Sequence, residues 1–341
     1  MPGLRTAMRY VALGVAALGG LAACGGPPVA APPPPTSAPA AAPTTAGPPP
    51  TTAGPPPATR AGTTVLYGVT VDDTSRLSET LAALRALPVR PTVRVVFGAA
   101  ASPGEYLPAV RQLAGSATVM GELLDSSEET QVPVDAMASR TRRYMAVLGR
   151  YVSIWEVGNE VNGNWLGPYP DVASRLTAAY NQVSEAGGLT ALTLYANQFG
   201  PDHCGDGPAE ATPEQFSSRY VPAPIRDHLN YVFLSYYPSQ CGRLEPGNAQ
   251  LRAEMQALHA LYPSASLGLG EVGLPAAATT ATTPLARQVM AWAYSLDPGL
   301  AYYVGGYFWW YAAEDALGPG RPLASSLVTA LRTEKTALGG A

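Results

Sequence analysis

One short unit is repeated eight times along the chain after about residue 63. Each unit is an apolar run rich in Val, Ile, Leu or Tyr, then a turn, then a longer amphipathic stretch. This alternation predicts a parallel sheet whose strands are joined by helices. The expected strands are 65–71, 92–97, 117–123, 152–157, 189–195, 231–236, 266–270 and 302–309.

The first expected helix shows the helical period clearly. Its apolar face consists of Leu77, Leu81, Leu84 and Leu87, and Pro88 closes the segment before the next strand. Further helices are expected over 134–148, from 170–171 onward and from 282–284 onward. In the last two, a proline suits the first helical turn.

Eight units in a row favour the α/β class and, within it, a closed (β/α)8 TIM barrel. About 250 residues are typical of this fold, and residues 63–341 provide that length. An open doubly wound sheet often carries a Gly-rich phosphate loop after its first strand, whereas residues 68–73 offer none. In a barrel the loops after the carboxyl ends of the strands build the active site, so we expect chemistry there.

The first 23 residues have the features of a signal peptide. Arg5 and Arg9 are followed by an apolar run over 10–23, which is too short for a spanning helix. Residues 21–24, Leu-Ala-Ala-Cys, resemble the bacterial lipoprotein signal, so we expect cleavage before Cys24 and lipidation of its thiol. An ordinary secretory signal is the alternative. The expected location is extracytoplasmic, with the lipid anchored in the cell membrane.

Residues 24–62 are almost entirely Pro, Ala, Thr and Gly. They hold too few large apolar side chains to form a core, so we expect a disordered tether. In extended polyproline form it could reach roughly 100 Å. The folded domain is expected over 63–341.

Charge and cysteine usage narrow the possible partners. The net charge is −4, and only 13% of residues are charged, so the basic surface of a nucleic-acid binder is missing. Cys204 and Cys241 are the cysteines besides Cys24, and an oxidising compartment favours a disulfide between them. The three histidines are scattered singly, so we expect no metal and no cofactor. We also expect a monomer.

Two glutamates stand at strand ends. Glu160 lies in Trp-Glu-Val-Gly-Asn-Glu-Val-Asn (155–162) after the fourth strand, and Glu271 lies in Gly-Leu-Gly-Glu-Val-Gly (268–273) at the seventh. Carboxylates at one rim of a barrel can face each other at the roughly 5 Å separation that retaining glycoside hydrolysis requires. A single glutamate at such a position is more often a cap or a solvated loop residue. The pair, with Asn159 before Glu160, therefore carries the prediction.

The chain resembles the clan of (β/α)8 retaining glycosidases whose acid/base and nucleophile glutamates end strands four and seven. The resemblance covers the barrel region, and Asn159-Glu160 is its most specific element. It implies that Glu160 is the acid/base and Glu271 the nucleophile. It also implies that Asn159 contacts the sugar hydroxyl beside the reacting carbon.

The same resemblance implies further substrate-site residues. Arg94 would hold the nucleophile ionised, and Tyr237 would donate a hydrogen bond to it. The run Ser-Tyr-Tyr-Pro at 235–238 is similar to endo-galactanases. Trp309 or Trp310 would form the floor of a sugar subsite.

From the residue types alone, several of these roles have structural alternatives. Arg94 could anchor an internal salt bridge. Trp165 could be a sugar-stacking platform or could cap a core. Neighbouring strand residues alternate between faces, so one of Trp309 and Trp310 should pack behind the sheet. Glu122 and Asp125, at the end of the third strand, could reach sugar hydroxyls, but they are expected to be solvated loop carboxylates.

The catalytic chemistry sets expectations for the two glutamates. A nearby cation and phenol should lower the pKa of the nucleophile, whereas burial and the charge of Glu271 should raise the pKa of Glu160. The predicted activity is retaining hydrolysis of a β-linked glycoside or polysaccharide by double displacement. A carbohydrate-binding lipoprotein without turnover is the alternative. Many clan members place histidines around the substrate, whereas here Ser235 stands beside the tyrosines of the sixth strand and no histidine follows the third strand. A transglycosylase is a third possibility.

Overall fold

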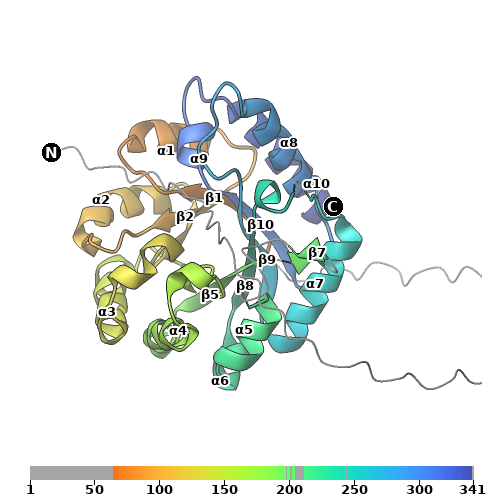
Figure 1. The fold of residues 1–341 in the computed structure, drawn as a ribbon. Coiled ribbons are helices and arrows are strands. Elements are labelled where there is room, and N and C mark those ends of the chain that lie inside the picture. Colours follow the sequence, from red (N-terminus) through yellow and green to blue (C-terminus); the bar gives the residue numbers. More distant parts are fainter. Residues whose placement is uncertain (1–63, 197, 200–201, 204–210, 243, 340–341) are drawn as a thin grey trace, which may run out of the picture. The chain divides into compact units, whose positions relative to one another are not determined.

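Eight parallel strands close into a barrel in the computed structural model (Figure 1), which describes residues 64–196, 198–199, 202–203, 211–242 and 244–339. The predicted fold class, a (β/α)8 TIM barrel, is confirmed. Each of the eight barrel strands lies within two residues of its expected bounds. Around the barrel the order is β1 (Leu66–Val71), β10 (Tyr303–Trp309), β9 (Ser266–Val272), β8 (Tyr231–Tyr236), β5 (Leu189–Tyr195), β4 (Ile154–Gly158), β3 (Thr118–Glu122) and β2 (Thr92–Val96).

Helices surround the barrel on its outer side (Figure 1). The expected helix over 134–148 is divided into a 3-10 turn, Val134–Ala136, and an α-helix. A small antiparallel pair, β6 (Gln198–Phe199) and β7 (Asp202–His203), follows β5. The helices are α1 (Leu77–Arg85), α2 (Pro103–Ala114), α3 (Met137–Leu148), α4 (Tyr169–Glu185), α5 (Pro213–Tyr220), α6 (Ala223–His228), α7 (Asn248–Leu261), α8 (Thr283–Ala293), α9 (Ala312–Asp315) and α10 (Ala324–Leu338).

Local sequence signals fix several helix starts. At α2, Glu105 accepts from the backbone N–H of Ser102 at 2.7 Å, which satisfies a donor that the helix itself leaves free. Pro103 is the first residue of that helix, where its fixed φ and missing N–H cost little. Helix α5 begins in the same way, with Thr212 capping and Pro213 first.

The core has two layers. A small cluster made only of strand residues fills the barrel interior, and a much larger cluster lies between the strands and the helices. Because side chains alternate along a strand, neighbouring residues belong to different layers, as with interior Phe308 and outer Trp309. The interior cluster consists of Leu66, Met120, Ile154, Ala191, Phe233, Val304 and Phe308.

Bulges interrupt this alternation on β9 and β10. Leu234 and Ser235 of β8 pair with Leu269 and Glu271, so β9 carries one extra residue between them. On β10 the extra residue falls between Gly306 and Trp309, the partners of Tyr67 and Val69. Gly305, Gly306 and Tyr307, at or next to this bulge, have positive φ. A bulge re-aims the side chains that follow it.

The predicted signal peptide and tether, residues 1–62, lie outside the described residues and stay predictions. Within the part of the chain that the structure describes, no helix is both long enough and apolar enough to cross a membrane.

Candidate active site

The candidate site lies at the carboxyl ends of the strands. Glu271 is near the end of β9, and Asn159 and Glu160 follow β4 directly. Arg94 comes from the middle of β2, and Tyr237 follows β8. The structure therefore brings these five predicted site residues to one rim of the barrel, although they span most of the folded sequence.

Each oxygen of the Glu271 carboxylate has a donor. Nη2 of Arg94 donates to Oε2 at 2.6 Å, and the Tyr237 hydroxyl donates to Oε1. Nδ2 of Asn159 lies 3.4 Å from Oε2. Glu271 is only 4% exposed, so these contacts act in a desolvated environment where charge-assisted hydrogen bonds are strong. They hold the carboxylate in a fixed direction.

Glu160 is held from two sides. The Ser126 hydroxyl donates to Oε2 at 2.8 Å, and the Ser235 hydroxyl donates to Oε1. Its backbone has a φ of 47°, which is rare for a residue other than glycine and is found most often at functional sites. The loop thus turns the Glu160 side chain toward the rim at a conformational cost.

Burial is the largest cause that raises the pKa of Glu160, and the negative charge of Glu271 raises it further. The hydrogen bonds from Ser235 and Ser126 act in the opposite direction. The net result of these opposing effects is that the pKa of Glu160 is raised to about 8. At neutral pH this carboxyl carries a proton, which agrees with the direction expected from the sequence.

Asn159 links the two glutamates. Its Oδ1 accepts from the backbone N–H of Ser126 at 3.1 Å, and its Nδ2 donates toward Glu156 and Glu271 at 3.2 and 3.4 Å. Asn159 is only 2% exposed. The predicted contact with a sugar hydroxyl stays a prediction.

Arg94 is fully buried behind Glu271. Its guanidinium also faces Glu122 and Glu156, with Nε 3.2 Å from Oε2 of Glu122 and Nη1 3.5 Å from Oε2 of Glu156. Burial acts to lower the pKa of Arg94, but the charges of Glu156, Glu122 and Glu271 raise it well above its ordinary value. Arg94 therefore stays cationic, and its two suggested roles, holding Glu271 and anchoring internal ion pairs, coexist.

The expectation that Glu122 is a solvated loop carboxylate is wrong. Its side chain is 0% exposed and lies against Arg94. The last residue of β3 points into the barrel because it pairs in register with Glu156, which also faces Arg94. Burial raises the pKa of Glu122 well above its ordinary value despite the opposing charge of Arg94.

The two tyrosines at the end of β8, Tyr236 within the strand and Tyr237 directly after it, separate as alternation predicts. Tyr236 is fully buried, and its hydroxyl donates to the backbone O of Leu244 at 2.8 Å. Tyr237 turns to Glu271 instead. Burial, followed by the charge of Glu271, raises the pKa of Tyr237 well above its ordinary value, so its hydroxyl remains a donor.

The two tryptophans also separate. Trp309 is fully buried in the outer core, and its Nε1 donates to Oδ2 of Asp315 at 2.9 Å. Trp309 therefore does not line the site. Trp310 is half-buried, and its ring lies 4.8 Å from Cζ of Arg94. Of the two, Trp310 remains the candidate for the predicted subsite floor, which stays a prediction.

Trp165 packs against the core. It lies in the 3-10 turn Asn164–Leu166 after β4, and its ring meets that of Tyr195 edge-on at 5.2 Å. This contact matches the core-capping alternative, while the stacking role stays a prediction. Trp165 Nε1 is buried and has no hydrogen-bond partner among the described residues.

The predicted disulfide between Cys204 and Cys241 stays a prediction. Cys241 is buried at the end of the 3-10 turn after β8, but Cys204 lies outside the described residues. No group of three or more His, Cys, Asp or Glu side chains suited to a metal ion occurs in the described ranges.

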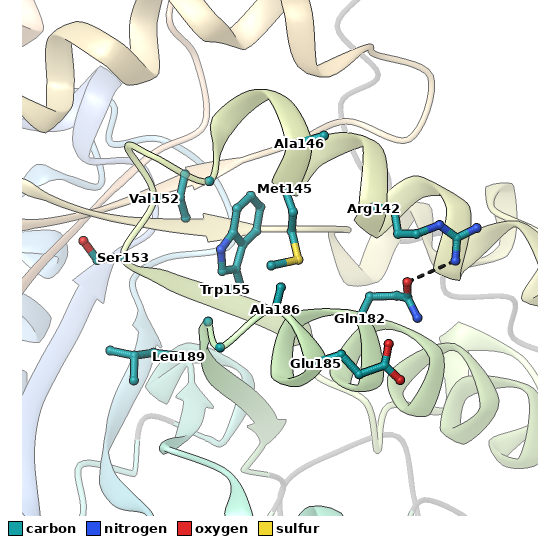
Figure 2. Close-up of a pocket in the computed structure, with 13 residues that line it drawn as sticks. Arg142, Met145, Ala146, Val152, Ser153, Trp155, Gln182, Glu185, Ala186 and Leu189 are labelled. Carbon is teal, nitrogen blue, oxygen red and sulfur yellow. Dashed lines mark hydrogen bonds between the residues drawn. The ribbon is translucent and has the colours of Figure 1, made fainter.

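A surface groove lies at the opposite end of the barrel (Figure 2). It is lined by residues just before and at the start of β4 and β5, including Trp155 and Leu189, and by residues of α3 and of the last turn of α4. Arg142 of α3 donates to Gln182 of α4 at 3.0 Å across it. Because the groove is at the amino ends of these strands, it is separate from the site at the carboxyl ends.

Four polar residues of the site were given no catalytic or binding role by sequence reasoning: Ser126, Glu156, Thr193 and Ser235. Thr193 of β5 donates to Oε1 of Glu156 at 2.5 Å, and the two serines hold Glu160. Ser235 is visible in the sequence as a departure from the clan's histidine pattern. Ser126 and Thr193 have no local signal, because serine and threonine are common in loops and strands.

Comparison with solved structures finds barrels of glycoside hydrolases. The GH1 beta-glucosidase from Exiguobacterium antarcticum B7 matches with a TM-score of 0.51 and 11% identity, over 77% of this chain and 87% of that one. A GH5-4 broad specificity endoglucanase from an uncultured bacterium matches with a TM-score of 0.52 and 12% identity, over 79% and 86%. At sequence identities this low, the similarity shows that this chain shares the fold of these proteins.

No protein-family model matches the sequence. No curated protein matches it either.

Proposed function

We propose that this protein is a retaining glycoside hydrolase that cleaves a β-linked glycoside or polysaccharide. One observation carries the proposal: at a single barrel rim, the buried carboxyl of Glu160, whose pKa is raised to about 8 in part by the charge of Glu271, accompanies a Glu271 carboxylate that is fixed by Arg94 and Tyr237. Pairs of carboxyls whose environments differ in this way divide the roles of acid and nucleophile. The named solved structures, a beta-glucosidase and an endoglucanase, support the same reaction class by fold.

In the first step, an oxygen of Glu271 forms a bond to the anomeric carbon. The bond from that carbon to the leaving oxygen breaks, and the leaving oxygen takes the proton of Glu160. Arg94 and Tyr237 orient the attacking carboxylate. The donors that they present are fixed before the substrate arrives, so little reorganisation is needed during the reaction.

In the second step, Glu160 accepts a proton from water as the water oxygen bonds to the anomeric carbon. The ester bond to Glu271 breaks and the carboxylate is restored. Once Glu271 has become an ester, it no longer raises the pKa of Glu160, which helps Glu160 to act as a base. The two displacements together retain the anomeric configuration.

The test is product stereochemistry on a panel of 4-nitrophenyl β-glycosides and soluble β-glucans and galactans, followed by proton NMR from the first minutes of reaction. We expect the β-anomer to form first. An α-anomer would overturn the retaining mechanism, and binding without any product would favour the carbohydrate-binding alternative. Added alcohol or sugar acceptor that captures most of the product would indicate a transglycosylase.

We also propose that the domain is held outside the cytoplasmic membrane by lipid on Cys24. The sequence Leu-Ala-Ala-Cys and the proline-rich stretch behind it support this proposal. Incorporation of labelled palmitate in a bacterial host tests it, with Cys24→Ala as the variant. Equal labelling of both proteins would overturn the anchor.

A further inference from the structure

Three carboxyl groups share one buried guanidinium. Nη2 of Arg94 lies 2.6 Å from Glu271, Nε lies 3.2 Å from Glu122, and Nη1 lies 3.5 Å from Glu156. The side chains of Arg94, Glu122 and Glu156 are 0% exposed. Only Glu271 is used by the mechanism above, so the other two carboxyls lack a role.

The reaction creates a charge problem at this cluster. Forming the glycosyl ester removes the negative charge of Glu271, while Arg94 stays cationic and fully buried. A buried charge that loses its partner is costly. A site with Arg94 and Glu271 alone would therefore oppose formation of the covalent intermediate.

We propose, on the basis of the proposed function, that Glu156 is a positioning residue that serves as the permanent counter-ion of Arg94. It keeps the guanidinium paired while Glu271 alternates between carboxylate and ester. Glu156 then lowers the barrier to forming the intermediate, because Arg94 is not left unpaired when the charge of Glu271 disappears.

The contacts favour Glu156 over Glu122 as the charged partner. Oε1 of Glu156 accepts from the Thr193 hydroxyl at 2.5 Å and from Nδ2 of Asn159 at 3.2 Å. These donors stabilise its charged form. Neither oxygen of Glu122 accepts a hydrogen bond among the described residues. Burial raises the pKa of both carboxyls, and it raises the pKa of Glu122 well above its ordinary value. Two adjacent buried carboxylates would repel, so we assign the proton to Glu122, which lacks the donors that Glu156 has.

The two chemical steps can be measured separately. A 2,4-dinitrophenyl 2-deoxy-2-fluoro-β-glycoside of a sugar that the wild-type domain cleaves inactivates a retaining enzyme by the first step. Reactivation of the purified glycosyl-enzyme in buffer then reports the second step. Loss of the charge on Glu156 should affect these rates differently, whereas a general structural defect should slow both.

The decisive variant is Glu156→Gln, which keeps the size of the side chain and an oxygen that accepts from Thr193 and Asn159. We expect inactivation to slow about 10-fold or more, equivalent to about 1.4 kcal/mol, and reactivation to be no slower than in the wild type. Glu156→Asp, which restores the charge, should recover part of the inactivation rate. Equal slowing of both steps, or no change in either, would overturn the proposal.

Two comparisons complete the test. Glu122→Gln should not change the ratio of the two rates; a ratio change like that of Glu156→Gln would assign the counter-ion to Glu122 and overturn the proposal. Glu254→Gln removes a partly buried glutamate of α7 outside the site, and should leave both rates unchanged. If the wild type cleaves none of the glycosides, the proposed function itself fails, which is distinct from an active enzyme whose two steps respond equally.

Discussion

Ser235 donates a hydrogen bond from its hydroxyl to Oε1 of Glu160, joining the carboxyl end of β8 to the loop after β4. Ser126 holds the other oxygen from the loop after β3. Both bonds lower the pKa of Glu160, while burial and Glu271 raise it to about 8. The serines therefore limit how strongly the proton is held.

Ser235→Ala should move the basic limb of the kcat/KM profile to higher pH. A general acid works only while protonated, so the rate falls as pH rises through its pKa. Removing a hydrogen bond that lowers the pKa of Glu160 raises that pKa. Profiles of kcat/KM from pH 5 to 10 measure the effect. Ser217→Ala, which changes a buried serine bonded to Pro213 in α5, should leave the limb in place; an unmoved limb in Ser235→Ala would contradict the prediction.

Glu160→Gln should depend strongly on the leaving group. Without proton donation, glycosides of poorly acidic alcohols should lose roughly 10² to 10⁴-fold in kcat/KM. Glycosides of 2,4-dinitrophenol need no proton and should lose far less. Steady-state rates on a series of aryl glycosides test this. Equal losses across the series would remove Glu160 from the acid role.

Glu271→Gln should lose about 10⁴-fold or more in kcat, because the nucleophile is removed while the shape is kept. Glu254→Gln is the matched control, since Glu254 is a partly buried glutamate of α7 away from the rim. Initial rates on the best glycoside of the panel provide the measurement. Retention of more than a few per cent of activity by Glu271→Gln would exclude it as nucleophile.

Trp310→Ala should mainly reduce activity, whereas Trp309→Phe should mainly reduce stability. The first removes a half-buried ring beside Arg94 and should lower kcat/KM about 10-fold with little loss of stability. The second removes the donor to Asp315 in the core and should lower the free energy of unfolding by about 1–3 kcal/mol. Kinetics and urea unfolding on both variants distinguish the roles. Reversed effects would place Trp309 at the site.

Glu160 should make the wild type less stable at alkaline pH. Its pKa is about 8 in the folded protein and about 4.3 in an unfolded chain. Between these values the folded state binds more protons, so the contribution of Glu160 to stability falls as pH rises from about 4 to 8. Glu160→Gln should therefore gain stability relative to the wild type by up to a few kcal/mol at pH 9 compared with pH 4.5. A constant difference in urea unfolding at the two pH values would contradict this.

The two principal glutamates could be found from sequence because their signals are local. Glu160 follows an apolar run and an Asn, and Glu271 ends another run, so strand counting alone places both at one rim. The hydrogen-bond partners of Glu160 could not be predicted from the sequence. Ser126 and Ser235 lie 34 residues before it and 75 residues after it, and nothing in their neighbourhoods announces the contact.

The sequence alone determined the eight strands, their order and the rim that carries the acids, because hydrophobic periodicity and strand ends are properties of short segments. The tertiary structure decided which way key side chains point. Leu269 and Val272 face the outer core, so simple alternation from Leu269 would send residue 271 outward too. The extra residue on β9 turns Glu271 inward to Arg94 instead. Such a bulge depends on pairing with a distant strand, which no local pattern encodes.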